Sequence, residues 1–149
     1  MKPIRYPLYA LVAAAAAFAV ARADDAGASS SHAKAAEPLD VSHGQEVKLA
    51  DFLVPGKITV FDFYSHYCPP CMAEAPLVRK LHETRQDLAV VDVDINRPGI
   101  RGIDWESPVA KEFQLDSIPH FKVYDAQGKL MAEGDEARAL VDGWEKAGS

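Results

Sequence analysis

An apolar run that leads directly into a cysteine pair constrains the fold of this chain more than any other feature. Residues 58–64 are almost continuously apolar and rich in β-branched and aromatic side chains, which is typical of a strand buried on both faces. The run Cys68-Pro69-Pro70-Cys71 follows at once. Because proline suits the first turn of a helix, where no backbone N–H is needed, the pattern predicts a strand, a short turn and then a helix.

The rest of the sequence alternates between helix and strand patterns. The helix after the cysteines continues at least to Leu81, with apolar and charged residues interleaved. The later elements are predicted, in chain order, as a strand at 88–95, a short helix from Pro108 to about Gln114 with Ser107 as N-cap, strands at 121–124 and 129–132 around a turn, and a final helix with an apolar stripe at Ala137, Leu140, Val141 and Trp144. This order predicts an α/β fold in which a central mixed β-sheet is flanked by helices on both faces.

The first residues have the layout of an export signal. Lys2 and Arg5 precede an apolar run at 8–20, and Ala21-Arg22-Ala23 has the small-x-small form of a cleavage site. We therefore predict a signal peptide at 1–23 and a protein that works in the periplasm or another extracytoplasmic compartment. An uncleaved membrane anchor is the alternative, although the apolar run is short for a spanning helix.

The chain of 149 residues is long enough for one domain. Residues 24–38 are rich in Ala, Ser, Asp and Lys without apolar periodicity, which predicts a flexible linker before a domain at 39–149. The segment before Asp24 holds three of the 16 basic residues and no acidic one, so 13 basic and 22 acidic residues follow it, with a formal charge of −9. Because nucleic acids and anionic membranes repel a domain with this negative charge, we do not expect them as partners.

The chain has two cysteines, and both lie in the Cys68–Cys71 motif. A bridge across so short a loop constrains the unfolded chain very little, so a purely structural disulfide explains the pair poorly. Redox exchange and metal binding remain as explanations for the pair. Exchange needs an attacking thiolate, a second thiol that releases the mixed disulfide, and a group that moves a proton. At a helix N-terminus Cys68 is expected to be the exposed nucleophile, and Cys71, one turn later, the shielded resolving thiol.

The residues around this pair resemble a known family. The run Phe61-Asp62-Phe63-Tyr64-Ser65-His66-Tyr67-Cys68-Pro69-Pro70-Cys71 is similar to the active-site segment of the thioredoxin fold family. Its continuation Met72-Ala73-Glu74-Ala75-Pro76 resembles the Cys-x-x-Glu-x-Pro pattern of the exported TlpA/ResA-type branch. The resemblance extends from about Val47 to Trp144 and implies a thioredoxin-like fold with thiol–disulfide oxidoreductase activity.

Asp62 is the proton-handling candidate. A carboxyl in the middle of an apolar strand is costly unless it is neutral or paired, and a satisfied core or edge residue is the structural alternative. The resemblance implies that Asp62, six residues before Cys68, is the buried acid that helps to deprotonate Cys71. Asp92 stands where thioredoxins have a lysine, which predicts a second carboxyl close to the first.

The resemblance also implies a substrate-binding surface. Ile118 and Pro119 match the family's Ile-cis-Pro loop, which faces the cysteines, and Gly134 matches the glycine beside the substrate groove. Tyr67 stands where thioredoxins usually have tryptophan and provides a flat apolar wall. Of the histidines, His82 has no ligand-like spacing and is expected at the surface.

The expected function is reduction of disulfides in exported client proteins, for example during cytochrome c or copper-site assembly, as the TlpA/ResA likeness implies. The redox-active disulfide Cys68–Cys71 is expected to serve without a further cofactor or metal, in a monomer supplied by an upstream electron donor such as a membrane thiol reductase. Two alternatives stay open. One is an oxidase or isomerase of exported proteins, and the other is a Cu(I) metallochaperone, because soft thiolates select Cu(I).

Overall fold

The structure is a computed structural model that describes residues 33–148. The predicted signal peptide at 1–23 and residues 24–32 of the predicted linker lie outside the described residues. Within residues 33–148, no helix is both long enough and apolar enough to cross a membrane.

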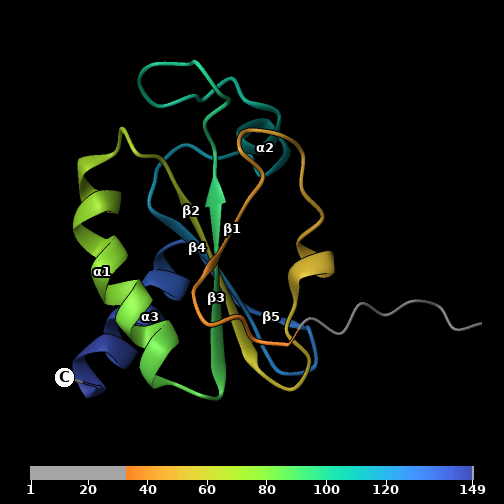
Figure 1. Ribbon diagram of the computed structural model, residues 1–149, viewed down its shortest axis with the longest axis vertical. Coiled ribbons are helices and arrows are strands. Elements are labelled where there is room, and N and C mark those ends of the chain that lie inside the picture. Colours follow the sequence, from red (N-terminus) through yellow and green to blue (C-terminus); the bar gives the residue numbers. More distant parts are fainter. Residues whose placement is uncertain (1–32, 149) are drawn as a thin grey trace, which may run out of the picture.

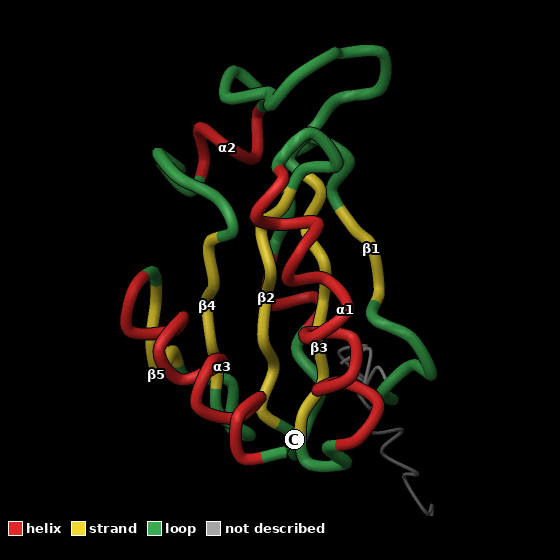
Figure 2. The backbone as a smooth tube through the Cα atoms, turned by 90° about the vertical axis from the view of Figure 1, so that its left-hand side faces the viewer, coloured by secondary structure: helices red, strands yellow, loops and turns green. Residues whose placement is uncertain are grey.

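A five-stranded mixed sheet forms the centre of the domain, in the order β1-β3-β2-β4-β5 (Figure 2). The strands are β1 (Leu39–Val41), β2 (Ile58–Tyr64), β3 (Leu88–Asp94), β4 (His120–Tyr124) and β5 (Leu130–Glu133). β3 pairs in parallel with both β1 and β2, whereas β4 is antiparallel to β2 and β5. The predicted mixed sheet is therefore confirmed.

Helices cover both faces of this sheet, as predicted. α1 (Pro69–Thr84) and α3 (Asp135–Ala147) lie against one face, to the left of the sheet in Figure 1. α2 (Pro108–Glu112) and the short 3-10 helix η1 (Leu49–Phe52) lie on the other side. η1 has four residues and strand β1 has three, which is too short for either element to show a pattern in the sequence.

The side chains of β2 divide between two apolar layers. Val60 packs beneath α1 and α3, whereas Phe61 and Phe63 pack on the opposite face with Val109 of α2. Because successive side chains of a strand point to opposite faces, Asp62 lies on the same face as Val60. The alternation that buries both phenylalanines thus directs the Asp62 carboxyl toward α1.

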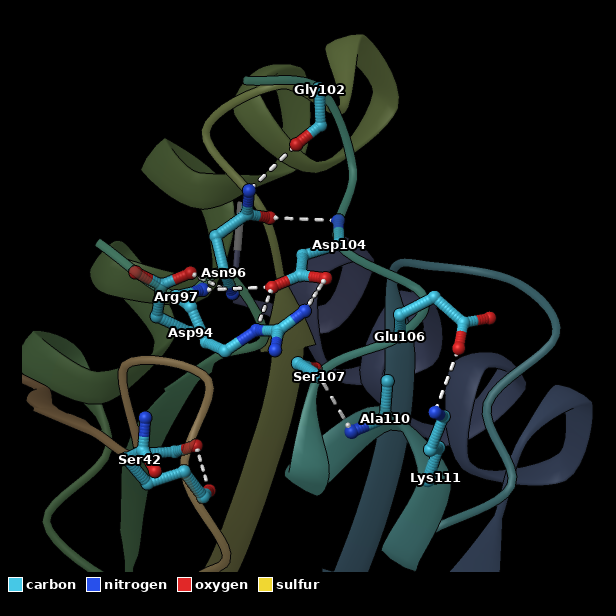
Figure 3. A network of polar contacts seen from close by, with 11 residues as sticks. Ser42, Asp94, Asn96, Arg97, Gly102, Asp104, Glu106, Ser107, Ala110 and Lys111 are labelled. Atoms are coloured by element: carbon cyan, nitrogen blue, oxygen red, sulfur yellow. Dashed lines mark hydrogen bonds and ion pairs between the residues drawn. The ribbon is translucent and has the colours of Figure 1, made fainter. Parts of the chain in front are cut away.

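The loop between β3 and α2 is fixed by its own polar contacts (Figure 3). Arg97 donates to both carboxylate oxygens of Asp104, from Nε at 2.7 Å and from Nη2 at 3.0 Å. Asn96 Nδ2 donates to the carbonyl of Gly102 at 2.6 Å, and Asn96 Oδ1 accepts from the Asp104 N–H at 3.4 Å. The Ser107 hydroxyl accepts from the Ala110 N–H at 3.2 Å, which confirms the predicted N-cap of α2.

His82 is buried, so its predicted surface position is wrong. Its Nδ1 accepts from the Val90 N–H of β3 at 2.9 Å, and its Nε2 lies 3.0 Å from the Ala35 carbonyl. These partners require the tautomer in which Nε2 carries the proton. Lys34 also donates to the Arg85 carbonyl at 2.7 Å, so the described end of the predicted linker is bound to α1.

Replacing His82 with leucine tests this bridge. His82→Leu keeps much of the volume but leaves the buried Val90 N–H without its acceptor, so we expect the free energy of unfolding to fall by about 1–3 kcal/mol. Urea denaturation measures the change. As a control, Glu83→Leu alters the next, exposed residue of α1 and should change stability by less than about 0.5 kcal/mol. Equal effects of the two substitutions would contradict a structural role for His82.

Candidate active site

A tight turn at the end of β2 places the cysteine motif. Ser65 is fully buried; its carbonyl accepts from the Cys68 N–H at 3.0 Å, and its hydroxyl accepts from the Tyr67 N–H at 3.0 Å. Pro69 and Pro70 then occupy the first turn of α1, where a missing N–H costs nothing. Cys68 is consequently the N-cap residue of α1.

Cys68 and Cys71 form a disulfide, with their Cα atoms 5.3 Å apart. The Cys71 N–H donates to Cys68 Sγ at 3.2 Å, so the first sulfur occupies the position of a helix cap. When the bridge is reduced, the same N–H and the positive end of the helix dipole favour a thiolate at Cys68.

Both cysteines are buried in this disulfide form, with 2% of Cys68 and 1% of Cys71 exposed. The expectation that Cys68 is exposed and Cys71 shielded is therefore wrong for this state. The two residues differ in their surroundings instead. Cys68 Sγ lies 3.6 Å from the Ile118 carbonyl oxygen, whereas Cys71 lines a cavity on the α1 side of the sheet.

The loop before β4 covers Cys68. The Ile118–Pro119 peptide bond is cis, as the resemblance implied, and the Ile118 side chain packs against the apolar layer around Phe61 and Phe63. This packing fixes the loop, so the Ile118 carbonyl is held opposite Cys68 Sγ.

Two further substrate-site candidates flank this loop. Tyr67 is 49% exposed directly before Cys68, so its ring is available to a partner. Gly134 begins α3 with φ +60°, and its N–H donates to the Phe121 carbonyl at 2.9 Å. A Cβ at Gly134 would lie 3.7 Å from His120 Cε1, an ordinary contact, so its backbone conformation rather than space favours glycine. Substrate binding by either residue stays a prediction.

Asp62 is buried in the middle of β2, with 4% of the residue exposed. Its Oδ1 atom has no hydrogen-bond partner among the described residues. Burial raises the pKa of this carboxyl well above its ordinary value, and the nearby acids Asp92 and Glu74 raise the pKa further. Asp62 and Cys71 line the same cavity of about 250 Å³, so the carboxyl faces the space beside the resolving cysteine.

Asp92 lies next to Asp62, as the sequence predicted. The two residues are register partners on the parallel strands β2 and β3. Burial raises the pKa of Asp92 to about 6, with a smaller contribution from Asp40. The site therefore holds two neighbouring carboxyl groups.

An ion pair near Asp62 was not predicted. Arg138 of α3 donates from Nη2 to Oε2 of buried Glu74 at 2.8 Å. Burial raises the pKa of Glu74 despite the opposing effect of Arg138. Glu74 stands in the Cys-x-x-Glu-x-Pro pattern, but nothing local in the sequence pairs it with a residue 64 positions away.

Within residues 33–148, no group of three or more histidine, cysteine, aspartate or glutamate side chains is arranged to hold a metal ion. His66, the histidine nearest to the cysteines in sequence, has its ring 5.2 Å from that of Tyr64, centroid to centroid.

Comparisons with known proteins place this arrangement in a family. The Thioredoxin family model matches residues 44–143. Among curated relatives, thioredoxin F2 of Arabidopsis thaliana is 34% identical over 67 residues, which are 45% of this chain and 32% of that protein. A thiol:disulfide interchange protein TxlA homolog of Synechocystis is 30% identical over 98 residues, which are 64% of this chain and 50% of that protein. The chain thus spans half or less of the length of these two relatives.

Solved structures show the same fold. The short form of spinach chloroplast thioredoxin f superposes with a TM-score of 0.51 at 25% identity, over 79% of this chain and 99% of that chain. The thioredoxin pre-protein of Schistosoma mansoni, at 22% identity, has a TM-score of 0.52 over 74% of this chain and 97% of that chain. Together with the match of the family model to 44–143, they show that the chain belongs to the thioredoxin family, whose members are thiol–disulfide oxidoreductases.

Proposed function

We propose that this protein is a thiol–disulfide oxidoreductase that reduces disulfides of exported partner proteins. The position of the Cys68–Cys71 disulfide carries the proposal. The bridge lies at the start of α1, with the Ile118 carbonyl on one side and a cavity that contains Asp62 on the other. A bridge that served only stability would need no buried carboxyl beside it, because such a carboxyl costs folding free energy.

In the proposed cycle, the Cys68 thiolate attacks one sulfur of a client disulfide. A bond forms between Cys68 and that sulfur, and the other client sulfur leaves as a thiolate. Cys71 then gives its proton to Asp62 and attacks Cys68 Sγ, which closes the Cys68–Cys71 disulfide and releases the second client thiolate. Two electrons pass from the dithiol to the client, and an upstream thiol donor restores the dithiol.

The acidic surroundings of the pair favour the reducing direction. Asp62 and Glu74 are buried close to the cysteines, and Asp92 adjoins Asp62. A carboxylate near the cysteines disfavours a thiolate there and so destabilises the reduced form of the pair. The disulfide is then the more stable form, and the reduced pair gives up its electrons readily. The N-terminus of α1 acts in the opposite sense on Cys68. The residue before the cis-proline is Ile118, and isoleucine at this position is typical of the thioredoxins that this chain resembles. This likeness also favours reduction.

We infer the place of action and the partners from the predicted leader and the charge. The predicted signal peptide at 1–23 and the TlpA/ResA likeness support work in the periplasm, in cytochrome c or copper-site assembly, with electrons from a membrane thiol reductase. The acidic domain suits neutral or basic client proteins. The similarity to a thiol:disulfide interchange protein supports exchange with protein thiols.

Substitution of each cysteine tests the exchange mechanism. Cys71→Ser keeps the attacking thiol but removes the thiol that releases the client, so we expect mixed disulfides with clients to accumulate. Cys68→Ser removes the attacking thiol and should capture none. Non-reducing electrophoresis of each variant, after incubation with oxidised insulin, measures the captured fraction.

Equal capture by the two variants would contradict the assignment of Cys68 as nucleophile. Absence of capture in both, together with stoichiometric Cu(I) binding by the reduced protein, would contradict the exchange function and support the metallochaperone alternative.

Asp62→Asn tests the proposed base. The first attack by Cys68 should keep its rate, whereas release of the mixed disulfide should slow by about 10²-fold, because a positioned proton acceptor contributes that much or more. Stopped-flow measurement of the two steps separates them. Asp51→Asn, which removes the same charge from an exposed position, is the control. Unchanged release and unchanged pH dependence would make Asp62 a structural residue only.

The same variant should show a pH-dependent gain in stability. The unfolded chain gives up this proton near its ordinary pKa of 3.8, whereas the buried carboxyl keeps its proton to higher pH. The wild-type free energy of unfolding therefore falls, relative to that of Asp62→Asn, as pH rises from the unfolded pKa to the folded pKa. The difference amounts to about 1.4 kcal/mol for each unit between the two pKa values.

A further inference from the structure

Three aspartates lie in one row across the sheet. Asp62 of β2 is the register partner of Asp92 on β3, and Asp92 is the register partner of Asp40 on β1. All three line the cavity that also contains Cys71. Neighbouring strands are about 4.8 Å apart, so the carboxyls of adjacent residues in the row can come within reach of each other or of one shared water.

Exposure increases along this row. Asp62 is buried, Asp92 is half-buried and Asp40 is exposed. Asp62 Oδ1 has no hydrogen-bond partner among the described residues, although it is buried. Asp62 also lines the cavity that it shares with Asp92 and Asp40. The row thus connects the buried base beside Cys71 with the protein surface.

Charged groups surround Asp62 and Asp92, the two inner members of the row. The Asp62 carboxyl is influenced by Glu74 of α1 and by Arg138 and Glu145 of α3. Asp92 is influenced by Asp40 from β1, which raises its pKa, and by Arg79 of α1, which lowers its pKa. Arg79 lines the cavity as well, and it is paired with Glu37.

The exposed end of the row continues into a hydrogen bond. The Tyr64 hydroxyl donates to Asp40 Oδ2 at 3.0 Å, and it lies 3.4 Å from His66 Nε2. Burial raises the pKa of Asp40, whereas the hydrogen bond from Tyr64 lowers it. Tyr64 and His66 also line the cavity, so polar side chains border its outer end.

We propose that Asp92 and Asp40 form the exit path for the proton that Asp62 takes from Cys71. This inference rests on the proposed exchange function and deepens it. The Cys71 S–H bond breaks as the proton passes to Asp62, the new Cys71–Cys68 bond forms, and the bond between Cys68 and the client breaks. The proton then passes from Asp62 through Asp92 and Asp40 to water, and the departing client thiolate takes a proton from water outside the site.

The path resolves a difficulty in the use of a buried carboxyl as a base. A protonated Asp62 cannot accept the proton of Cys71, and burial favours that protonated state. An adjacent acid offers that proton a second position, because two coupled carboxyls share protons as a pair and lose them in separate steps. When the shared proton resides on Asp92, the Asp62 carboxylate is free to accept the proton of Cys71.

Asp92→Asn is the direct test. The reduced variant is mixed with dithiobis(nitrobenzoate), whose coloured thiolate is released once when Cys68 attacks and once when Cys71 resolves. We expect the first phase to keep its rate and the second to slow by about tenfold, less than in Asp62→Asn because the base itself remains. The pH midpoint of the second phase should also fall, because loss of the Asp92 charge lowers the pKa of Asp62.

Asp51→Asn is the matched control. The substitution removes the same charge, but Asp51 is exposed on η1 and does not line the cavity. Its second phase should keep the wild-type rate. A second variant, Asp92→Gly, adds chemical rescue. Formate is small enough to enter the cavity, and it should restore the second phase in a concentration-dependent way without accelerating the wild type.

The outcomes separate the two proposals. A wild type that gives no first phase would overturn the exchange function itself. A normal first phase with an unchanged second phase in Asp92→Asn would overturn only the exit path. A lowered pH midpoint without slowing, or slowing without rescue by formate, would also overturn the path, because Asp92 would then act only through its charge or its packing.

Discussion

Burial of the Asp62 carboxyl between the central strand and α1 is the constraint on which the rest of the site depends. The alternation of β2 puts Phe61 and Phe63 into one apolar layer, and it leaves Asp62 on the other face beside Cys71. The Asp62 Oδ1 atom has no hydrogen-bond partner among residues 33–148, and burial raises the pKa of the carboxyl, so ionisation of this carboxyl opposes folding. Retention of a carboxyl that opposes folding is consistent with a role in proton transfer. The cavity beside the carboxyl provides a route for the proton.

The cysteines are held by elements on both sides of this carboxyl. The turn at Ser65 fixes Cys68 as the cap of α1, and the Ile118 carbonyl is held opposite its sulfur by packing of the Ile118 side chain. Both sulfurs are buried while they are bonded to each other. The oxidised form is thus closed around its disulfide, and the differences between the two cysteines come from their neighbours rather than from exposure.

The sequence predicted the parts of this site that depend on local pattern. The run 58–64, the proline-rich start of α1 and the Ser107 cap each follow from residues that are adjacent in the chain, and all three are confirmed. The burial of Cys68 depends on a loop 50 residues away, and the burial of His82 depends on Val90 and Ala35. The aspartate row needed β1, whose three residues carry no pattern that distinguishes a strand from a loop. Local pattern therefore did not predict which residues become neighbours on adjacent strands, or which distant segments of the chain come into contact.

We infer that carboxyl groups around the cysteine pair make this domain a reductant. The decisive measurement is the equilibrium reduction potential of the Cys68–Cys71 couple against a glutathione buffer. We predict a potential near the value of about −270 mV that is typical of thioredoxin. A potential near about −120 mV, as in the strongly oxidising exported oxidases, would contradict it, because the dithiol would then be the favoured state despite its acidic surroundings.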